Sequence, residues 1–262
     1  MTTDSVWRGG SIGDHTHAVL APNPGPMTLD GTNTWVLHTP GDDTAVVVDP
    51  GPLDEGHLQA VLAYVEQLGA RVGLTLITHW HHDHTESLGR WAELVDVPVR
   101  GGGHGDAFAD DERIVLGLLQ IRVIATPGHT ADSVSFHLPD ADVLVTGDTV
   151  LGRGTTVVAH PDGALGPYLA SLDKLHAIAA QRPTALAPAH GPTHADAGAV
   201  IASYKKHRLE RLDQVRAALA AGDADATDVA QAIVERVYAA VPREVWPAAK
   251  LSVQAQLEYL RG

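Results

Sequence analysis

The chain has 262 residues, a formal net charge of −14 at pH 7 and no cysteine. The absence of cysteine excludes a disulfide framework and thiolate metal ligands, and no apolar stretch approaches the ~20 residues that a membrane span needs. The N-terminal residues lack the basic and apolar regions of a signal peptide. We therefore expect a cytoplasmic protein without membrane contact, long enough for one large domain with a small appendage.

Residues 1–200 alternate strand-like and helix-like segments. We expect strands at Thr34–Leu37, Ala45–Val48, Leu74–Ile77, Ile114–Leu116, Ile121–Ala125, Ser133–His137, Val143–Thr146 and Ala185–Ala187. We expect helices at Leu58–Leu68, Glu86–Leu94 and Tyr168–Ala180. This mixture predicts an α/β fold of two sheets with helices on the outside.

From residue 203 onward the pattern becomes helical. The expected helices are Ser203–Leu219, Val229–Tyr238 with Thr227 as its N-cap, and Ala248–Leu260, with a break at Gly222 and Asp223. The sequence therefore predicts a main domain over residues 1–202 and a small helical domain over residues 203–262. A homodimer formed through the helical tail is one option for assembly.

The charge is divided unevenly between these two domains. Residues 1–202 hold 9 Lys and Arg against 24 Asp and Glu, whereas residues 203–262 hold 9 against 8. An acidic main domain argues against broad electrostatic capture of nucleic acid. Such a contact would have to begin at the tail, where Lys205, Lys206, Arg208 and Arg211 lie on the first helix. The alternative is that these side chains form a solvated helix face.

Seven consecutive residues carry most of the functional information: Thr78-His79-Trp80-His81-His82-Asp83-His84. They follow an apolar run that predicts a buried strand, and a strand end is a rigid position for ligands. Imidazole and carboxylate together suit zinc and its first-row neighbours, whereas calcium or magnesium prefers an all-oxygen shell. The spacing lets His79 and His81 point the same way, while the following turn brings Asp83 and His84 to a second point. One stretch could therefore begin two adjacent metal sites.

Three further residues could complete these sites. His129, Asp148 and His190 each follow an apolar, strand-like run and lie in a turn that contains Gly or Pro. We assign His79, His81 and His129 to one ion, Asp83, His84 and His190 to the other, and Asp148 to a bridge between them. Asp49 either orients a metal-binding histidine or caps a turn.

Candidate substrate-binding residues lie near the ligands in the sequence. Arg153 and Thr155 belong to the loop after Asp148, which could hold a phosphate or carboxylate or could be only a solvated turn. Asn33 either lines the pocket or shapes the turn before a strand. Lys205, Lys206 and Arg208 are the candidates in the tail.

Four stretches give the chain a resemblance to the metallo-β-lactamase superfamily, and within it to the β-lactamase-like-2 branch, which includes a mitochondrial single-strand-specific endoribonuclease. They are residues 23–35 with Gly31-Thr32-Asn33-Thr34-Trp35, residues 78–84, residues 147–157 beginning with Gly147-Asp148-Thr149, and His190-Gly191-Pro192 leading into Ser203-Tyr204-Lys205-Lys206-His207-Arg208. The resemblance implies a four-layer αβ/βα sandwich, two zinc ions and a C-terminal winged-helix-like domain.

The predicted chemistry is hydrolysis at a two-metal centre. Two ions ~3.5–4 Å apart can share a hydroxide, lower its pKa and stabilise the charge that develops on the attacked oxygen. Asp83 could orient the hydroxide or accept its proton, and His190 could assist the leaving group. Zinc is the expected metal, although iron or manganese would suit the same ligands.

The leading hypothesis for the substrate is single-stranded RNA, cleaved at its phosphodiester bonds. The alternative is a thioester hydrolase that resembles glyoxalase II and acts on a small-molecule ester or thioester. A β-lactamase is disfavoured because the tail and residues 25–33 look foreign to that branch. A metal-binding module without catalysis is disfavoured because all seven ligand positions are intact.

Overall fold

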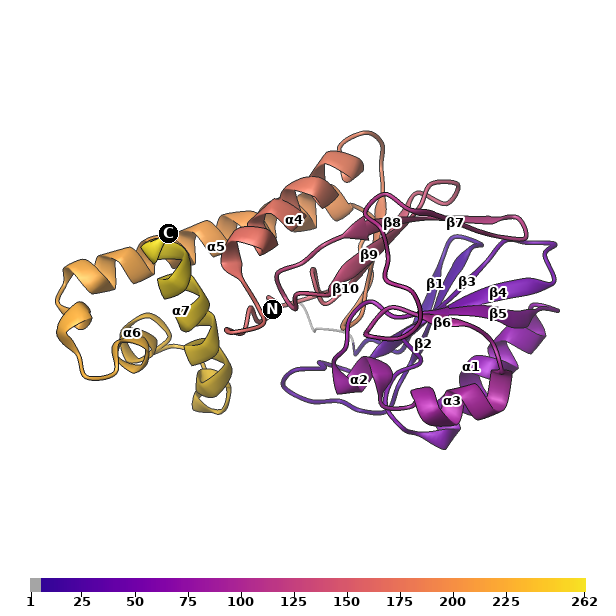
Figure 1. The fold of residues 1–262 in the computed structure, drawn as a ribbon, viewed down its shortest axis with the longest axis horizontal. Helices are drawn as coiled ribbons and strands as arrows, with labels where there is room; N and C mark the ends of the chain where they lie inside the picture. The colour runs from indigo at the N-terminus through magenta and orange to yellow at the C-terminus, as the bar shows by residue number, and fades with distance from the viewer. Residues whose placement is uncertain (1–5) are drawn as a thin grey trace.

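The computed structural model describes residues 6–262, which form two β-sheets packed face to face (Figure 1). The first sheet has the strand order β1 (Gly10–Ile12), β2 (Thr16–Leu20), β3 (Asn33–His38), β4 (Thr44–Val48), β5 (Arg71–Leu76) and β6 (Val99–Arg100). The second has the order β11 (Ala185–Pro188), β10 (Val143–Gly147), β9 (Val134–Leu138), β8 (Leu119–Ala125) and β7 (Arg113–Leu116). The pairs β4–β5, β5–β6 and β10–β11 are parallel, and the other pairs are antiparallel.

The main core lies between the two sheets. Side chains alternate across each strand, so Trp35 and Leu37 of β3 enter this core, whereas Val36 points to the opposite face of the sheet. Phe136 of β9 and Val145 of β10 meet them from the second sheet. Strands β3 and β4 are buried along their whole length, because both of their faces are covered.

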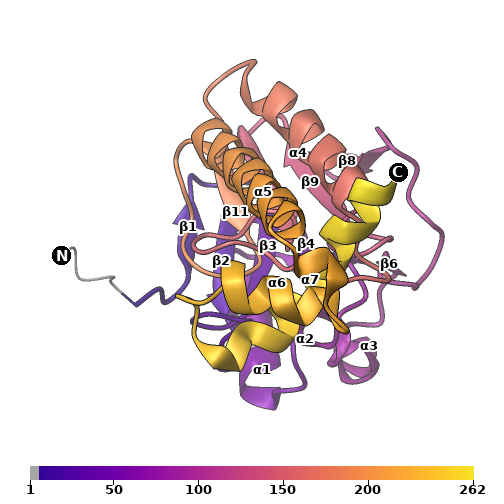
Figure 2. The ribbon, with the colours of Figure 1, turned by 90° about the vertical axis from the view of Figure 1, so that its left-hand side faces the viewer.

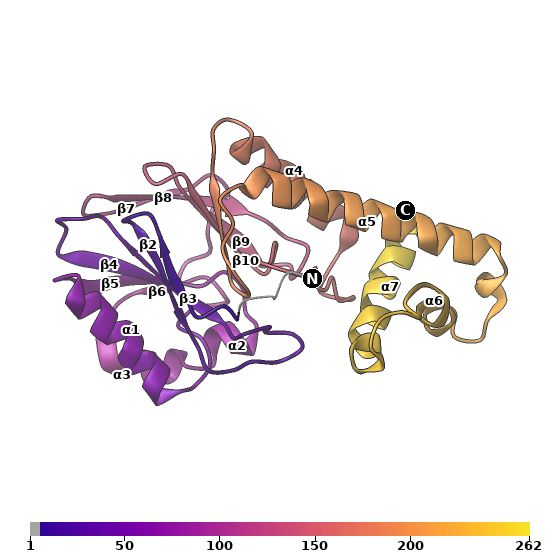
Figure 3. The ribbon, with the colours of Figure 1, turned by 180° about the vertical axis from the view of Figure 1, so that it is seen from behind.

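Helices cover the outer face of each sheet, which gives the predicted four-layer αβ/βα sandwich (Figure 3). Helices α1 (Glu55–Gln67) and α3 (Leu88–Val95) cover the first sheet, and Val61 and Trp91 pack there against Val47. Helices α4 (Leu165–Ala179) and α5 (Ala197–Ala220) cover the second. The short helix α2 (His82–Thr85) lies within the histidine-rich motif.

A small helical domain is built on the distal part of α5, which extends beyond the sandwich (Figure 1). Figure 2 shows this domain in front, with the sheets behind it. Helices α6 (Val229–Val237) and α7 (Trp246–Arg261) pack on it around Val215, Ile233 and Val253. Two short 3₁₀ turns, Asp223–Asp225 and Arg243–Val245, connect the helices. The three predicted helices are thus confirmed.

Some local expectations differ from the structure. Helix α5 begins at Ala197 because Asp196 accepts a hydrogen bond from the Ala199 N–H at 2.9 Å, so it runs unbroken through residues 202 and 203. The N-cap of α6 is Asp228 rather than Thr227, since the Asp228 carboxylate accepts from the Gln231 N–H at 3.0 Å. The short strands β1, β2 and β6 were not expected. Among residues 6–262 no helix has the length and apolar character needed to cross a bilayer.

Candidate metal centre

Four loops place the ligand-type residues at one edge of the sandwich. Strands β8, β10 and β11 run in the same direction, so their carboxyl ends lie at the same edge of the second sheet. His129 follows β8, Asp148 follows β10 and His190 follows β11. From the facing sheet, β5 leads into the loop and short helix that carry residues 79–84.

The first group consists of three ring nitrogens directed at one point. The His81 Nδ1 atom lies 3.0 Å from the His79 Nε2 atom and 3.0 Å from the His129 Nε2 atom. The ligand atoms of these residues and of Asp148 all lie within 4.8 Å of one another. The predicted grouping of His79, His81 and His129 is therefore present in the fold.

The second group lies beside the first. The Asp83 Oδ2 atom is 3.3 Å from the His84 Nε2 atom and 3.1 Å from the His190 Nε2 atom. Asp148 stands between the two groups, because its Oδ2 atom is 3.6 Å from His129 Nε2 and its Oδ1 atom is 3.2 Å from His190 Nε2. This is the position that a bridging carboxylate would need.

The donor atoms fit divalent metal ions. Two of them, His84 Nε2 and Asp148 Oδ1, are buried and, although each lies near an oppositely charged group, neither makes a hydrogen bond of normal geometry in the described chain. Buried polar atoms of this kind are better satisfied when an ion binds them. Imidazole and carboxylate ligands at about 2.0–2.2 Å from an ion stand roughly 3–3.5 Å apart in a tetrahedral arrangement. The spacings in both groups match that expectation. The geometry does not select one metal, since zinc, iron and manganese all accept this donor set.

The outward-facing nitrogen of four rings is held by a second contact. These contacts are His79 Nδ1 with Thr78 Oγ1 at 3.0 Å, His84 Nδ1 with Asp49 Oδ2 at 2.9 Å, His129 Nδ1 with the Val157 carbonyl at 2.7 Å, and His190 Nδ1 with the Gly31 carbonyl at 3.2 Å. Such contacts fix the orientation of a ring and leave its other nitrogen free to bind metal.

Asp49 is the residue beneath the motif. It is 1% exposed, and its backbone adopts the left-handed conformation, with φ of 53°. Its Oδ1 atom accepts from the Thr78 N–H at 2.8 Å, and its Oδ2 atom accepts from the Thr78 hydroxyl at 2.7 Å and contacts His84. Of the two roles expected for Asp49, the structure supports the orientation of a histidine.

Two rings of the first group, His79 and His81, are neutral at pH 7. Burial lowers the pKa of His79 well below its ordinary value, and the neighbouring rings lower it further. Burial together with the adjacent His129 lowers the pKa of His81 to about 4. Neutral imidazole is the form that binds a metal, so these two rings are ready for an ion without losing a proton.

The second group holds protons more tightly. Burial alone would lower the pKa of His84, but the Asp83 and Asp49 carboxylates raise it well above its ordinary value. Burial likewise opposes charge on His190, and Asp148 and Asp83 raise its pKa to about 9. The same attractions hold the pKa of both Asp83 and Asp148 below the ordinary range despite burial. Without metal, the group is a network of imidazolium and carboxylate ions.

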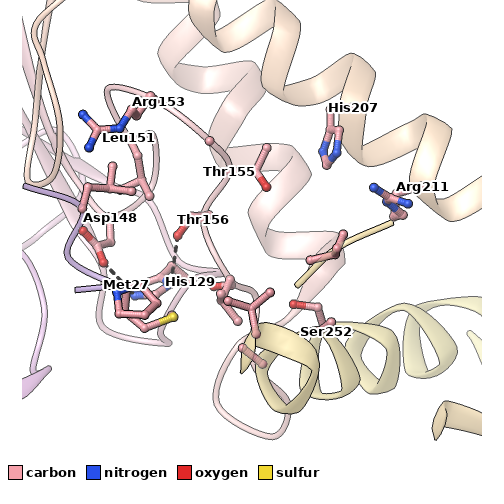
Figure 4. A pocket seen from close by; sticks show the side chains of 18 of the residues that line it. Met27, His129, Asp148, Leu151, Arg153, Thr155, Thr156, His207, Arg211 and Ser252 are labelled. Carbon is pink, nitrogen blue, oxygen red and sulfur yellow. Dashed lines mark hydrogen bonds and ion pairs between the residues drawn. The ribbon is translucent and has the colours of Figure 1, made fainter. Parts of the chain in front are cut away.

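A cavity of about 360 Å³ opens beside the centre (Figure 4). His129 and Asp148 lie at one end of it, and α5, α7 and the segment between α6 and α7 form the other. Its walls are mainly apolar and include Met27, Val241 and Ala248. The helical domain therefore completes a pocket that begins at the candidate metal ligands.

The predicted substrate residues near the centre occupy different environments. Arg153 and Thr155 line the pocket, and the Arg153 guanidinium pairs with Asp30. Asn33 is fully buried, and its Nδ2 atom donates to the carbonyls of Pro188 and Gly191 at 3.0 Å each. Asn33 therefore fixes the loop that carries His190.

The predicted tail residues do not gather on one surface. Lys205 pairs with Asp173, and the exposed Lys206 lies 3.8 Å from Glu210. Arg208 is buried, donates to the Thr156 carbonyl and lies over the Tyr168 ring.

Sequence reasoning missed His207 and the α7 residues as parts of the pocket. His207 and Arg211 are four residues apart and therefore lie on the same helix face, and this spacing could have identified His207 as a neighbour of the predicted basic residues.

Family models match both domains of the chain, and several known proteins are similar to it in sequence. The family model described as "Metallo-beta-lactamase superfamily" matches residues 27–113 and 102–190, and the "Beta-lactamase associated winged helix domain" matches residues 230–261. The chain is 32% identical over 213 residues to the beta-lactamase-like protein 2 homolog of Caenorhabditis elegans, covering 76% of this chain and 69% of that protein. It is 33% identical to the atrochrysone carboxyl ACP thioesterase of Aspergillus chevalieri, covering 87% of this chain and 74% of that protein.

The chain is also similar to a longer relative and to solved structures. A lactamase-like protein of Aspergillus niger is 33% identical across 77% of this chain, and the chain spans 62% of its length. The crystal structure of a metallo-beta-lactamase family protein from Thermus thermophilus superposes with a TM-score of 0.76, at 21% identity, covering 96% of this chain and 94% of that one. This likeness confirms the predicted fold, including the C-terminal domain. The chain belongs to the metallo-beta-lactamase superfamily.

Proposed function

We propose that the chain is a hydrolase with two metal sites, one formed by His79, His81 and His129 and the other by Asp83, His84 and His190, with Asp148 between them. Superfamily membership and the convergence of these donor atoms support this proposal. Zinc is the proposed metal, and the cytoplasmic location stays a prediction from the sequence.

We infer that the substrate is a thioester or ester with an apolar acyl part. The observation that carries this inference is the mainly apolar pocket that starts at Asp148 and His129 and is closed by α7. A single-stranded nucleic acid would instead favour a continuous cationic groove with exposed aromatic rings. Lys205 and Lys206 are paired with acidic residues outside the pocket. Similarity to proteins named thioesterases points the same way.

The side chains of the centre have distinct tasks in this reaction. When bound, two divalent ions would make a water molecule more acidic and neutralise charge on the attacked carbonyl oxygen. Asp83 is the more exposed carboxylate of the centre, with 30% of its side chain accessible against 11% for Asp148, so it is the residue placed to accept a proton from water. A thiolate is a stable leaving group with a pKa of roughly 8.5, so His190 need not act as an acid.

Single-stranded RNA is the second candidate substrate. The Arg211 guanidinium and the neighbouring His207 ring in the pocket favour it, because they could bind a phosphate that neighbours the scissile one. Similarity to beta-lactamase-like protein 2 homologs also supports it.

The test compares two substrates on one metal-loaded preparation. Hexanoyl-N-acetylcysteamine reports thioester hydrolysis through the released thiol, and a labelled single-stranded oligoribonucleotide reports cleavage. The inactive variant is His81→Ala, and the matched control is His82→Ala, because His82 lies in the same motif but is exposed and outside both ligand groups.

We expect thiol release by the wild type and by His82→Ala, and none by His81→Ala. A wild-type sample that holds two metals per chain and releases no thiol would rule out the thioester proposal. RNA cleavage with the same dependence on His81 would then make RNA the substrate.

A further inference from the structure

The neutral ring of His207 and the guanidinium of Arg211 form a polar end of the pocket, opposite the candidate metal ligands. They are four residues apart on α5 and therefore lie one above the other on the same helix face. Figure 4 shows both side chains on the far side of the cavity from Asp148 and His129. The mainly apolar wall of the pocket separates the two ends.

The charge of the pocket is opposite to that of the chain. The chain has a formal net charge of −14, yet three arginines line this cavity, and Asp148 is its one carboxylate among the described residues. Arg153 pairs with Asp30, and Arg208 is buried against Thr156. Arg208 forms no ion pair among residues 6–262, but it is buried, whereas Arg211 is partly exposed. Arg211 is therefore the cation that is more accessible to the contents of the pocket.

The contacts of Arg211 hold it in place without neutralising it. Its Nη1 atom donates to the Gln214 Oε1 atom at 2.9 Å and to the Val237 carbonyl at 3.0 Å, and its guanidinium lies 4.5 Å from the centre of the Tyr238 ring. None of these partners is charged, and no ion pair of Arg211 occurs within residues 6–262. A positioned and uncompensated guanidinium is a suitable receptor for a carboxylate.

His207 offers an unused polar atom next to this charge. Its Nδ1 atom is buried and has no hydrogen-bond partner in the part of the chain that the structure describes. Burial, followed by the nearby Arg208 and Arg211, lowers the pKa of His207, so the ring is neutral at pH 7. A neutral ring can present an N–H group at Nδ1 to an anion. The Thr155 side chain lies between this ring and the centre (Figure 4).

We propose that His207 and Arg211 bind a carboxylate of the substrate, remote from the bond that is cleaved. The substrate class is then an acyl thioester or ester in which an apolar segment separates the scissile carbonyl from an anionic end. This inference rests on the proposed function for its substrate class, whereas the anion site itself rests on the pocket.

The first arm of the test measures selectivity. Adipoyl-N-acetylcysteamine and hexanoyl-N-acetylcysteamine have acyl chains of equal length and differ by a terminal carboxylate. Hexanoyl-3-mercaptopropionate places the carboxylate on the thiol side instead. We expect the kcat/KM of the wild type to be at least tenfold higher for one of the two anionic substrates than for the neutral one, mainly because of a lower KM. The identity of the preferred anionic substrate then shows which side of the scissile bond faces α5.

The variants are Arg211→Gln and His207→Gln, with Arg211→Lys as the conservative change. We expect both glutamine variants to lose the preference for the anionic substrate while they still hydrolyse the neutral one, and Arg211→Lys to keep part of it. The matched control is Arg216→Gln, which removes an exposed arginine of the same helix outside the pocket and should leave the preference unchanged. An equal preference in the wild type and both glutamine variants would overturn the proposal.

The second arm measures binding without turnover. Titration calorimetry of the metal-loaded protein with adipate should show that the wild type and Arg216→Gln bind adipate with similar affinity. The affinity of Arg211→Gln and His207→Gln for adipate should be at least tenfold weaker. If this holds while no thioester is hydrolysed, the anion site stands and the proposed function fails. If the wild type binds no adipate, or binds it as tightly as the variants do, the carboxylate site is wrong. RNA cleavage that depends on Arg211, in a protein that does not bind adipate, would also overturn the carboxylate proposal. Arg211 would then be assigned to a phosphate group of RNA.

Discussion

Asp49 shows how one residue outside the ligand set can control the centre. Its carboxylate contacts His84 on one side and both polar groups of Thr78 on the other. Thr78 in turn contacts His79, so Asp49 is linked to one ligand of each proposed site. The backbone of Asp49 is left-handed, a conformation that aspartate adopts more readily than most residues, and the side chain is buried beneath the motif.

We expect Asp49→Asn to weaken metal binding about 10- to 100-fold, because an amide supports the His84 ring less strongly than a carboxylate does. Competition with a chromogenic chelator measures the affinity. The control is Asp54→Asn, which changes a carboxylate at the N-cap of α1 to another capping residue. Equal affinities in the wild type and Asp49→Asn would contradict the role given to Asp49.

The two proposed sites should differ in the protons that they release. In the metal-free protein the pKa of His84 and that of His190 are raised, the latter to about 9, so both rings carry protons at pH 7. Metal binding requires neutral rings and must displace these protons. The pKa values of His79 and His81 are lowered, so these two rings of the first site have no proton to release.

We expect proton release to accompany only one of two zinc-binding steps at pH 7, and to decrease as the pH rises through about 9. Calorimetry in buffers of different ionisation enthalpy counts the protons. His190→Ala should reduce the release by about one proton per chain, since it removes one of the two protonated rings. Proton release shared equally between both steps would show that the two sites do not differ as described.

At the scale of the elements, β3 holds the loop that follows β11. The Asn33 N–H donates to the Ala189 carbonyl at 2.7 Å, and its side chain donates to the carbonyls on either side of this segment. The Trp7 indole donates to the Asn33 Oδ1 atom at 2.8 Å. One buried side chain thus joins the N-terminal segment, the first sheet and the His190 loop.

We expect Asn33→Ala to lower the free energy of unfolding by about 3 kcal/mol, because each buried group left without a partner costs about 1–3 kcal/mol. Urea denaturation measures this loss, and chelator competition on the folded variant should show a weaker second site. The control is Asn23→Ala, which removes contacts to Thr32 but none to the His190 loop. A stable Asn33→Ala protein with normal metal affinity would contradict the positioning role.

At the scale of the whole molecule, the pocket exists because two parts of the chain meet. The metallo-beta-lactamase domain supplies Asp148 and His129, and α7 supplies Ala248 and Ala249 on the opposite wall. Substrate size should therefore be controlled by a helix that carries no metal ligand.

We expect Ala248→Trp to reduce kcat/KM for hexanoyl-N-acetylcysteamine at least tenfold through KM, because an indole would occupy much of a cavity of about 360 Å³. Metal content should be unchanged. The control is Leu251→Trp, at a position of the same helix that is 40% exposed and outside this pocket. An equal decrease in kcat/KM in both variants, or no decrease in either, would show that this wall of the pocket does not contact the substrate.

Local patterns in the sequence were sufficient to predict the fold class and the residues that converge at the candidate metal centre. His79, His81, Asp83 and His84 are recognisable because their spacing is local, and each remaining ligand follows an apolar strand in a turn. The strands of the core were predictable for the same reason, since burial on both faces leaves continuous apolar runs. The short strands β1, β2 and β6 carry no such run and were missed.

Contacts across the fold decide which side chains are available to a substrate. The basic residues of α5 are neighbours in sequence, but Lys206 is exposed, Arg208 is buried and Arg211 lines the pocket. Asn33 was expected either to line the pocket or to shape a turn, and in the structure it is a buried link to the His190 loop. The contacts of Asn33 join residues more than 150 positions apart, and a local pattern cannot show which partner a side chain meets across the fold.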